Sequence, residues 1–196
     1  LSKGYRQRTC LAQALLHDAG YESLGLDHFA APDDALAVAL RAGTLRRDFM
    51  GYTDRPEAPM IGLGPSAISE LPDRYVQQKS KLSSWWRAVE RGEPLLERGV
   101  RLTRDDRVRR DIIERLMTTL TLDIPAVEAR WGLAFAEVFA DELERLGPLQ
   151  ADGLVEVHPD RLVVPEHARL LVRLVAMVFD AHLARKADGP RFSQTV

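Results

Sequence analysis

The sequence predicts a chain with two parts, an α/β part over residues 1–99 and a mainly helical part over residues 100–196. In the first part, helical patterns alternate with short apolar runs, as they do in α/β units that share a parallel sheet. In the second part, three helical patterns are followed by two short alternating runs and a last helical pattern. That order is typical of a winged helix, so the chain is predicted to have two domains that meet near Val100.

The first part is predicted to contain three helices and two strands. The helices are expected over residues 8–19, 32–42 and 81–91, and the strands over residues 21–27 and 60–68. Gly20, Gly43 and Gly92 follow the three helical patterns, in the position where a glycine commonly ends a helix. Pro32 opens the second helix, where its fixed backbone angle is favourable. The run over residues 60–68 is short and apolar, which favours a buried strand and its following loop.

The second part begins with a long helix over residues 103–120, for which Thr103 is a good N-cap. Apolar side chains recur along this helix at helical spacing and predict a buried stripe. Further helices are expected over residues 126–130, 134–146 and 165–186, and a small hairpin over residues 154–157 and 162–164.

The composition is that of an ordinary globular protein: 196 residues, 45% hydrophobic and 29% charged, with a formal net charge of −2. This charge gives no general attraction to nucleic acid or anionic lipid. The one cysteine, Cys10, cannot form a disulfide within the chain, which favours a reducing, cytoplasmic location. The apolar run over residues 170–183 is too short and too charged to span a membrane. The chain begins at Leu1, so we expect a fragment whose N-terminal part is missing.

Three apolar segments, at residues 26–30, 49–53 and 62–69, end in polar residues or glycine and resemble strands that lead into loops. In barrel-type α/β proteins, chemistry collects at such strand ends. The third segment has the G-x-G-x-x-A spacing of a dinucleotide site, at Gly62, Gly64 and Ala67. Such a site needs a long helix directly afterwards, and Pro72 interrupts any helix there. We therefore interpret the glycines as a turn that allows close approach of backbone or ligand.

Asp27 and His28 could hold a proton shuttle or a metal, although such a pair is more often a hydrogen-bonded structural pair. The other histidines are scattered without ligand spacing, so the sequence predicts no metal site.

A winged helix raises the possibility of DNA binding, and the charge opposes it. Residues 103–186 carry 12 Lys and Arg against 15 Asp and Glu, and the predicted recognition helix over residues 134–146 is acidic. Because phosphate contacts supply most non-specific affinity, we expect no binding of nucleic acid. A basic cluster at Arg104, Arg107, Arg109 and Arg110 is interleaved with aspartates, which favours a solvated face over an anion site.

The motifs LDHFAAPDD at residues 26–34, RDFMGYT at 47–53 and GLGPSAIS at 62–69 resemble those of the oxygen-independent coproporphyrinogen III oxidases. LTRDDRVRRD at residues 102–111 and RFS at 191–193 resemble the same family. The resemblance covers almost the whole chain and keeps the order and spacing of the motifs.

This resemblance implies a radical S-adenosylmethionine enzyme that decarboxylates two propionates of coproporphyrinogen III to vinyl groups in haem biosynthesis. It implies a 4Fe–4S cluster, an electron donor for that cluster, and a monomer when the chain is full length. It also implies the last units of a partial (β/α) barrel, followed by a winged-helix-like C-terminal module. Within the matching motifs, Ile68, Phe49 and Met50 are expected to contact S-adenosylmethionine.

The sequence departs from the family pattern in two ways. The C-x-x-x-C-x-x-C motif that holds the cluster is absent, so we expect no turnover from this chain alone. Met50 stands where the family commonly has glutamine, and it offers only apolar contact. Two alternatives therefore stay open beside the enzyme: a non-catalytic haem-binding or chaperone-like relative on the same fold, and a winged-helix regulator.

Overall fold

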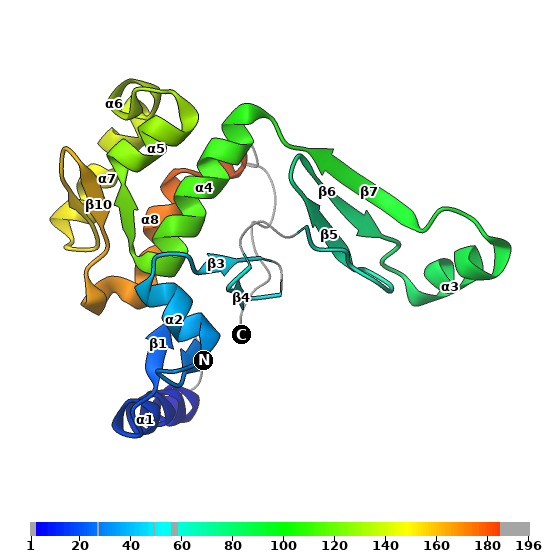
Figure 1. Ribbon diagram of the computed structural model, residues 1–196, viewed down its shortest axis with the longest axis horizontal. Coiled ribbons are helices and arrows are strands. Elements are labelled where there is room, and N and C mark those ends of the chain that lie inside the picture. Colours follow the sequence, from blue (N-terminus) through cyan, green and yellow to red (C-terminus); the bar gives the residue numbers. More distant parts are fainter. Residues whose placement is uncertain (1–2, 27, 49, 56–58, 185–196) are drawn as a thin grey trace.

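The structure of the protein is a computed structural model that describes residues 3–26, 28–48, 50–55 and 59–184 (Figure 1). In this part of the chain, ten short strands form four separate sheets, and every pairing is antiparallel. The expectation of a parallel sheet is therefore wrong for these residues. The reason is that most paired strands follow each other through short turns, whereas a parallel connection needs a crossover of about a dozen residues or more.

The N-terminal elements form a small helical and hairpin unit. They are α1 (Lys3–Asp18), β1 (Glu22–Leu24), β2 (His28–Ala30) and α2 (Ala35–Arg41). Gly20 has a positive φ of 83° and follows α1, which confirms the predicted end of the first helix. The Asp34 carboxylate accepts a hydrogen bond from the Leu36 amide and caps α2. The predicted second helix is thus confirmed, although it is shorter than expected.

The middle of the chain forms two sheets, and the second of them, together with α3, makes an extended arm. Its elements are β3 (Arg46–Arg47), β4 (Tyr52–Thr53), β5 (Ile68–Leu71), β6 (Arg74–Gln78), α3 (Leu82–Arg91) and β7 (Leu96–Arg101). In Figure 1, β5, β6 and β7 lie beside α4 and lead away from it to α3, at the far end of the arm.

The strand predicted over residues 60–68 is wrong in its placement. Met60 makes only an isolated bridge with Glu70, and the strand begins at Ile68. Gly62 crosses so close to the Ile68 backbone that a Cβ at Gly62 would lie 2.6 Å from the Ile68 carbonyl oxygen. This packing agrees with the interpretation of the glycines as a turn of close approach, and it shows that the approaching group includes backbone of the same chain.

The last part of the chain is mainly helical. Its elements are α4 (Arg104–Thr119), β8 (Thr121–Asp123), α5 (Ile124–Trp131), α6 (Phe135–Val138), α7 (Ala140–Ala151), β9 (Glu156–Val157), β10 (Arg161–Val163), the 3₁₀ helix η1 (Glu166–Leu171), α8 (Val172–Val178) and α9 (Ala181–Ala184). The predicted N-cap, Thr103, is confirmed, and it also forms a capping box: its hydroxyl accepts the Asp106 amide while the Asp106 carboxylate accepts the Thr103 amide. The predicted hairpin is confirmed as β9 and β10, with β8 added on the free side of β10.

Two predicted helices are interrupted in the structure. The one over residues 134–146 is divided at Phe139 into α6 and α7, and α7 continues to Ala151. The one over residues 165–186 is divided into η1, α8 and α9. Asp180 accounts for the last division, because its carboxylate accepts the His182 amide in place of a helical carbonyl.

The main hydrophobic core lies between α4 and the elements that follow it. It contains Val108, Ile112 and Leu116 of α4 and the aromatic cluster of Phe135, Phe139 and Phe179. A second, smaller core has the buried residues Leu24, Ala30 and Ala37, with Leu36 and Leu40 packed against it. No helix in the described ranges has the length and apolar character needed to cross a membrane.

Candidate functional site

Two cavities lie beside α4, between this helix and the strands of the first part. The smaller has a volume of about 260 Å³ and the larger about 780 Å³. They share five lining residues, which we call the shared wall: Arg47, Asp48, Glu70, Arg110 and Glu114. Arg110 and Glu114 lie one turn apart on α4, whereas Arg47 comes from β3 and Glu70 from β5. The shared wall thus joins three elements that are distant in sequence.

Polar contacts fix the shared wall. The Arg47 amide donates to the Glu114 carboxylate at 3.0 Å. Arg110 forms an ion pair with Glu70, and its guanidinium lies 5.6 Å from the centroid of the Tyr75 ring. Asp48 accepts the amide of Gly51 at 3.0 Å and so closes the turn between β3 and β4. These contacts hold charged groups in place in a region that is partly shielded from water.

Burial sets the electrostatics of the shared wall. It raises the pKa of Glu70, and the nearby carboxylates of Glu114 and Asp48 raise it further, while Arg110 lowers it. Burial also raises the pKa of the Tyr75 hydroxyl. Glu70 is therefore easier to protonate than an exposed glutamate, and Arg110 opposes this rise in its pKa.

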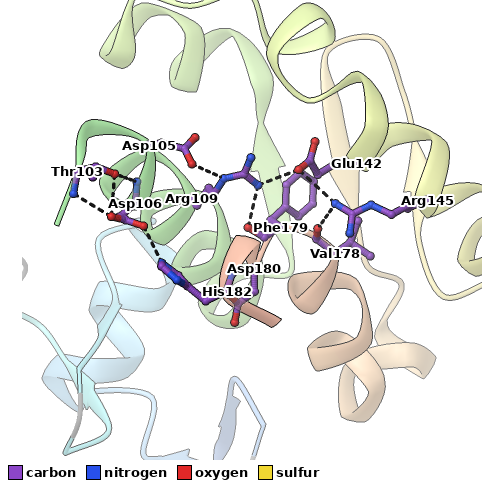
Figure 2. Close-up of polar contacts among 10 residues, drawn as sticks. All are labelled: Thr103, Asp105, Asp106, Arg109, Glu142, Arg145, Val178, Phe179, Asp180 and His182. Carbon is purple, nitrogen blue, oxygen red and sulfur yellow. Dashed lines mark hydrogen bonds and ion pairs between the residues drawn. The ribbon is translucent and has the colours of Figure 1, made fainter. Parts of the chain in front are cut away.

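A second network connects α4 with α7 and with the residues that follow it (Figure 2), and Asp106 and Arg109 of this network also line the larger cavity. Arg109, whose side chain is 16% exposed, donates to Asp105 and Glu142 at 2.8 Å and to the Phe179 carbonyl at 3.1 Å. Arg145 also pairs with Glu142, at 3.2 Å. Because Glu142 is buried, these two cations provide the pairing that a buried carboxylate requires.

The N-terminus of α4 contacts the C-terminal elements through one histidine. His182 Nε2 lies 2.8 Å from the Asp106 carboxylate, as Figure 2 shows. Hydrogen bonds from Thr103, together with His182, lower the pKa of Asp106 to about 2. Asp106 is therefore a carboxylate throughout the neutral range, and it contacts α4 and the residues after α8 at the same time.

Of the residues predicted to contact S-adenosylmethionine, the two that the structure describes, Ile68 and Met50, line neither cavity. Ile68 is half-buried at the start of β5, and Met50 is 84% exposed in the turn between β3 and β4. Phe49 lies outside the described residues. Ile68 and Met50 are each two positions in sequence from a residue of the shared wall, Glu70 and Asp48 respectively. Their contact with S-adenosylmethionine stays a prediction.

The Asp27–His28 pair is only partly described, because Asp27 lies outside the described residues. His28 begins β2, and its ring makes an edge contact with Tyr52 at a centroid distance of 5.0 Å. Among the described residues, no group of three His, Cys, Asp or Glu is arranged to hold a metal ion.

Within the basic cluster, Arg104 and Arg107 are exposed, as a solvated face requires, although Arg107 also lines the smaller cavity; the interpretation is wrong for Arg109 and Arg110. Those two are partly buried and paired with Glu142 and Glu70, which come from other elements. Sequence reasoning also missed Arg47 and Glu114 as site residues. Arg47 stands in one of the recognised motifs, which was the available signal.

Comparisons with known proteins all point to the same family. A family model for the HemN C-terminal domain matches residues 102–171. The oxygen-independent coproporphyrinogen III oxidase of Salmonella typhimurium is 46% identical over 92% of this chain and 40% of its own length. That of Escherichia coli is 43% identical over 93% of this chain and 40% of its own length. The Synechocystis protein of the same name is 40% identical over 92% of this chain and 40% of its own.

Among solved structures, coproporphyrinogen III oxidase (HemN) from Escherichia coli, a radical SAM enzyme, matches with a TM-score of 0.83 and 44% identity. The match covers 87% of this chain and 39% of that one. The chain thus spans about 40% of the length of the relatives it matches.

Proposed function

Because this chain belongs to the family of the oxygen-independent coproporphyrinogen III oxidases, we propose that it works as the C-terminal region of such an enzyme. The reaction is the oxidative decarboxylation of coproporphyrinogen III to protoporphyrinogen IX. The observation that supports this proposal most directly is the agreement of fold and sequence along one chain, a TM-score of 0.83 at 44% identity. Fold alone does not establish chemistry, and it is the sequence identity that supports a shared reaction.

We propose the same two domains that the sequence suggested, over residues 1–99 and 100–196. In this proposal, the first belongs to the last units of a partial (β/α) barrel, and the second is a winged-helix-like module. Two observations support the division. Among the described residues, the large core involves α4 and the elements after it, with Leu26 the one partner from the first part. The helices and the three-stranded sheet of β8, β10 and β9 also occur in an order close to that of a winged helix.

The reaction depends on S-adenosylmethionine and a 4Fe–4S cluster, which together supply an adenosyl radical that removes a hydrogen atom from the propionate. The donor set of this chain does not fit the cluster, because a C-x-x-x-C-x-x-C motif needs three thiolates and Cys10 is the sole cysteine. We assign no step of cluster chemistry to these residues. The ligands of the cluster, and the contact with its electron donor, belong to sequence outside this chain.

The apolar residues fit one portion of S-adenosylmethionine, the adenine ring, which packs well against aliphatic and thioether side chains. We propose that Ile68, Phe49 and Met50 make this contact in the complete enzyme. The half-burial of Ile68 and the exposure of Met50 support the proposal, because both can be covered by a ligand. The Met50 side chain offers no hydrogen bond where the family commonly has glutamine, so cofactor affinity depends more on packing.

The test is a chimeric enzyme in which this chain replaces the matching region of the Escherichia coli relative. We expect the chimera to convert coproporphyrinogen III under anaerobic conditions at about a tenth or more of the parental rate. In the chimera, Ile68→Asp should weaken S-adenosylmethionine binding in calorimetry, because it places a carboxylate in an apolar contact. Leu82→Asp is the matched control, since Leu82 is 65% exposed in α3, outside the motifs of the resemblance.

Two results would contradict the proposal. A chimera that folds and holds its cluster without converting coproporphyrinogen III would exclude the enzymatic role, and would favour a haem-binding or chaperone-like relative. Unchanged affinity for S-adenosylmethionine in the Ile68→Asp variant would exclude the assigned contact.

A further inference from the structure

The smaller cavity is unusually rich in arginine. Six guanidinium groups line it, and we call it the arginine cavity: Arg46, Arg47, Arg55, Arg107, Arg110 and Arg130. Four carboxylates share the lining, those of Asp48, Glu70, Asp111 and Glu114. The balance is therefore positive, in contrast to the larger cavity, which is lined by three arginines and five carboxylates.

Most of these guanidinium groups have no counter-ion in the described part of the chain. Arg110 is paired with Glu70, and Arg130 lies 3.8 Å from Asp111. The other four, Arg46, Arg47, Arg55 and Arg107, form no ion pair with a described residue. Cations gathered in a hollow without partners attract anions strongly, because the surrounding protein reduces the screening by water.

Arg47 is the best placed of the four. Its Nε atom is buried and has no hydrogen-bond partner among the described residues. Its guanidinium lies 5.6 Å from the centroid of the Tyr52 ring, and its amide is held by Glu114. Arg47 is thus fixed at its backbone and stacked on an aromatic ring, while a buried donor remains unused. A buried donor without a partner is unfavourable, and a ligand oxygen would remove that penalty.

The two cavities suit different portions of one ligand. The larger, at about 780 Å³, is within the range of small-molecule pockets and offers apolar side chains such as Ile113, Met117 and Phe179. The arginine cavity, at about 260 Å³, suits a side group of that ligand. Arg47 lines both cavities, so a group that extends from the larger cavity into the smaller one would meet its guanidinium.

We propose that Arg47 binds a propionate carboxylate of the tetrapyrrole substrate in the arginine cavity, with Arg55 and its neighbours adding positive charge. This inference rests on the proposed function, which supplies a ligand with propionate groups. A guanidinium matches a carboxylate through two parallel hydrogen bonds, a geometry that an ammonium group cannot reproduce. S-Adenosylmethionine also has a carboxylate, and the residues proposed to contact that cofactor, Ile68 and Met50, line neither cavity.

The experiment measures binding of coproporphyrin III, a stable fluorescent analogue of the substrate, to the 196-residue chain. Arg47→Gln should raise the dissociation constant about tenfold or more, as expected for the loss of a charge-assisted pair. Arg47→Lys should recover only part of the affinity. The control is Arg87→Gln, which removes an exposed arginine of α3 outside both cavities and should change nothing. Coproporphyrin III tetramethyl ester, which lacks the carboxylates, should bind wild type and Arg47→Gln equally.

Several outcomes would overturn the inference. Equal affinity of wild type and Arg47→Gln for coproporphyrin III would do so, as would failure of the wild-type chain to bind it. Loss of S-adenosylmethionine binding in Arg47→Gln, with coproporphyrin binding intact, would assign the carboxylate to the cofactor instead. If Arg47→Gln does not fold, Arg55→Gln replaces it, because Arg55 is exposed and its loss leaves the core intact.

The result is separable from the test of the proposed function. An active chimera combined with coproporphyrin binding that does not depend on Arg47 rejects this site alone. An inactive chimera combined with Arg47-dependent binding rejects the enzymatic role and leaves the carboxylate site in place.

Discussion

Asp106 connects the N-terminus of α4 to His182, and its pKa of about 2 lies below the ordinary value of 3.8. A carboxyl group whose pKa is lower in the folded than in the unfolded chain stabilises the fold above the unfolded value. That stabilisation is lost as the pH falls through the folded value. We therefore predict that Asp106→Asn lowers the free energy of unfolding at pH 7 by about 1 kcal/mol, the usual cost of a damaged helix cap. Wild type and variant should converge as the pH falls from about 4 to about 2.

Urea unfolding across this pH range measures the effect. Asp152→Asn is the matched control, because Asp152 is an exposed aspartate that follows α7, and its substitution should leave the pH dependence unchanged. A constant difference between wild type and Asp106→Asn at every pH would show that the carboxylate charge has no part in the stabilisation.

The sequence predicted the roles of single residues well where their partners are close in sequence. Thr103 was correctly identified as an N-cap because its partner, Asp106, is three positions away. The shared wall was missed because its contacts are distant: Arg47 and Glu114 are 67 positions apart, and Glu70 and Arg110 are 40 apart. Alternating charges on α4 suggested a solvated face, since nothing in that pattern shows which strands pack against it.

Helix α7 contains a glycine that packing does not require. Gly147 lies inside the helix, its φ is not positive, and a Cβ there would meet nothing within 4 Å apart from its chain neighbours, one of which is Pro148. Gly147→Ala should raise the free energy of unfolding by about 0.5–1 kcal/mol, because alanine restricts the unfolded chain and favours the helix. Chemical denaturation measures the change.

Gly132 provides the matched comparison for this substitution. It also has open space around it, but it follows α5 with a positive φ of 58°. Gly132→Ala should therefore lower the free energy of unfolding by about 1 kcal/mol, because the left-handed backbone is strained for alanine. If the two substitutions had the same sign, backbone conformation would not be the cause.

Helices were easier to predict than strands for a physical reason. Helix α3 was predicted to within one residue, because its apolar pattern and Gly92 are contained in one short segment. Strand β8 was not predicted, because it exists through pairing with β10, about forty residues later in the chain. Helix α7 was expected to end near Leu146, whereas it continues through Pro148 to Ala151. The tendency of proline to end a helix is thus overridden here, as tertiary packing frequently overrides local preferences.

For the whole molecule, the unequal size of the two cores predicts unequal stability. The large core is built on α4, and the small one has three buried residues, one each from β1, β2 and α2. We expect amide hydrogen exchange to be slowest over residues 103–120 and much faster over residues 21–27 and 60–68. The sheet of β5, β6 and β7 should also exchange quickly, because β7 is exposed along its whole length. Equal protection of these segments and α4 would contradict the prediction, and would indicate partners for the strands in a dimer.

The position of helix α4 limits which amino-acid substitutions it can accept. One side of the helix lies in the large core, another lines the two cavities, and its first turn forms the capping box. Of residues 104–120, only Arg104, Asp105 and Arg107 are exposed. Selection therefore acts on this helix from several directions at once, and a substitution that satisfies the core can still disturb a cavity. Even the exposed positions are constrained, because Asp105 pairs with Arg109 and Arg107 lines the arginine cavity. The arm around α3 can diverge between species with little effect on the rest of the molecule.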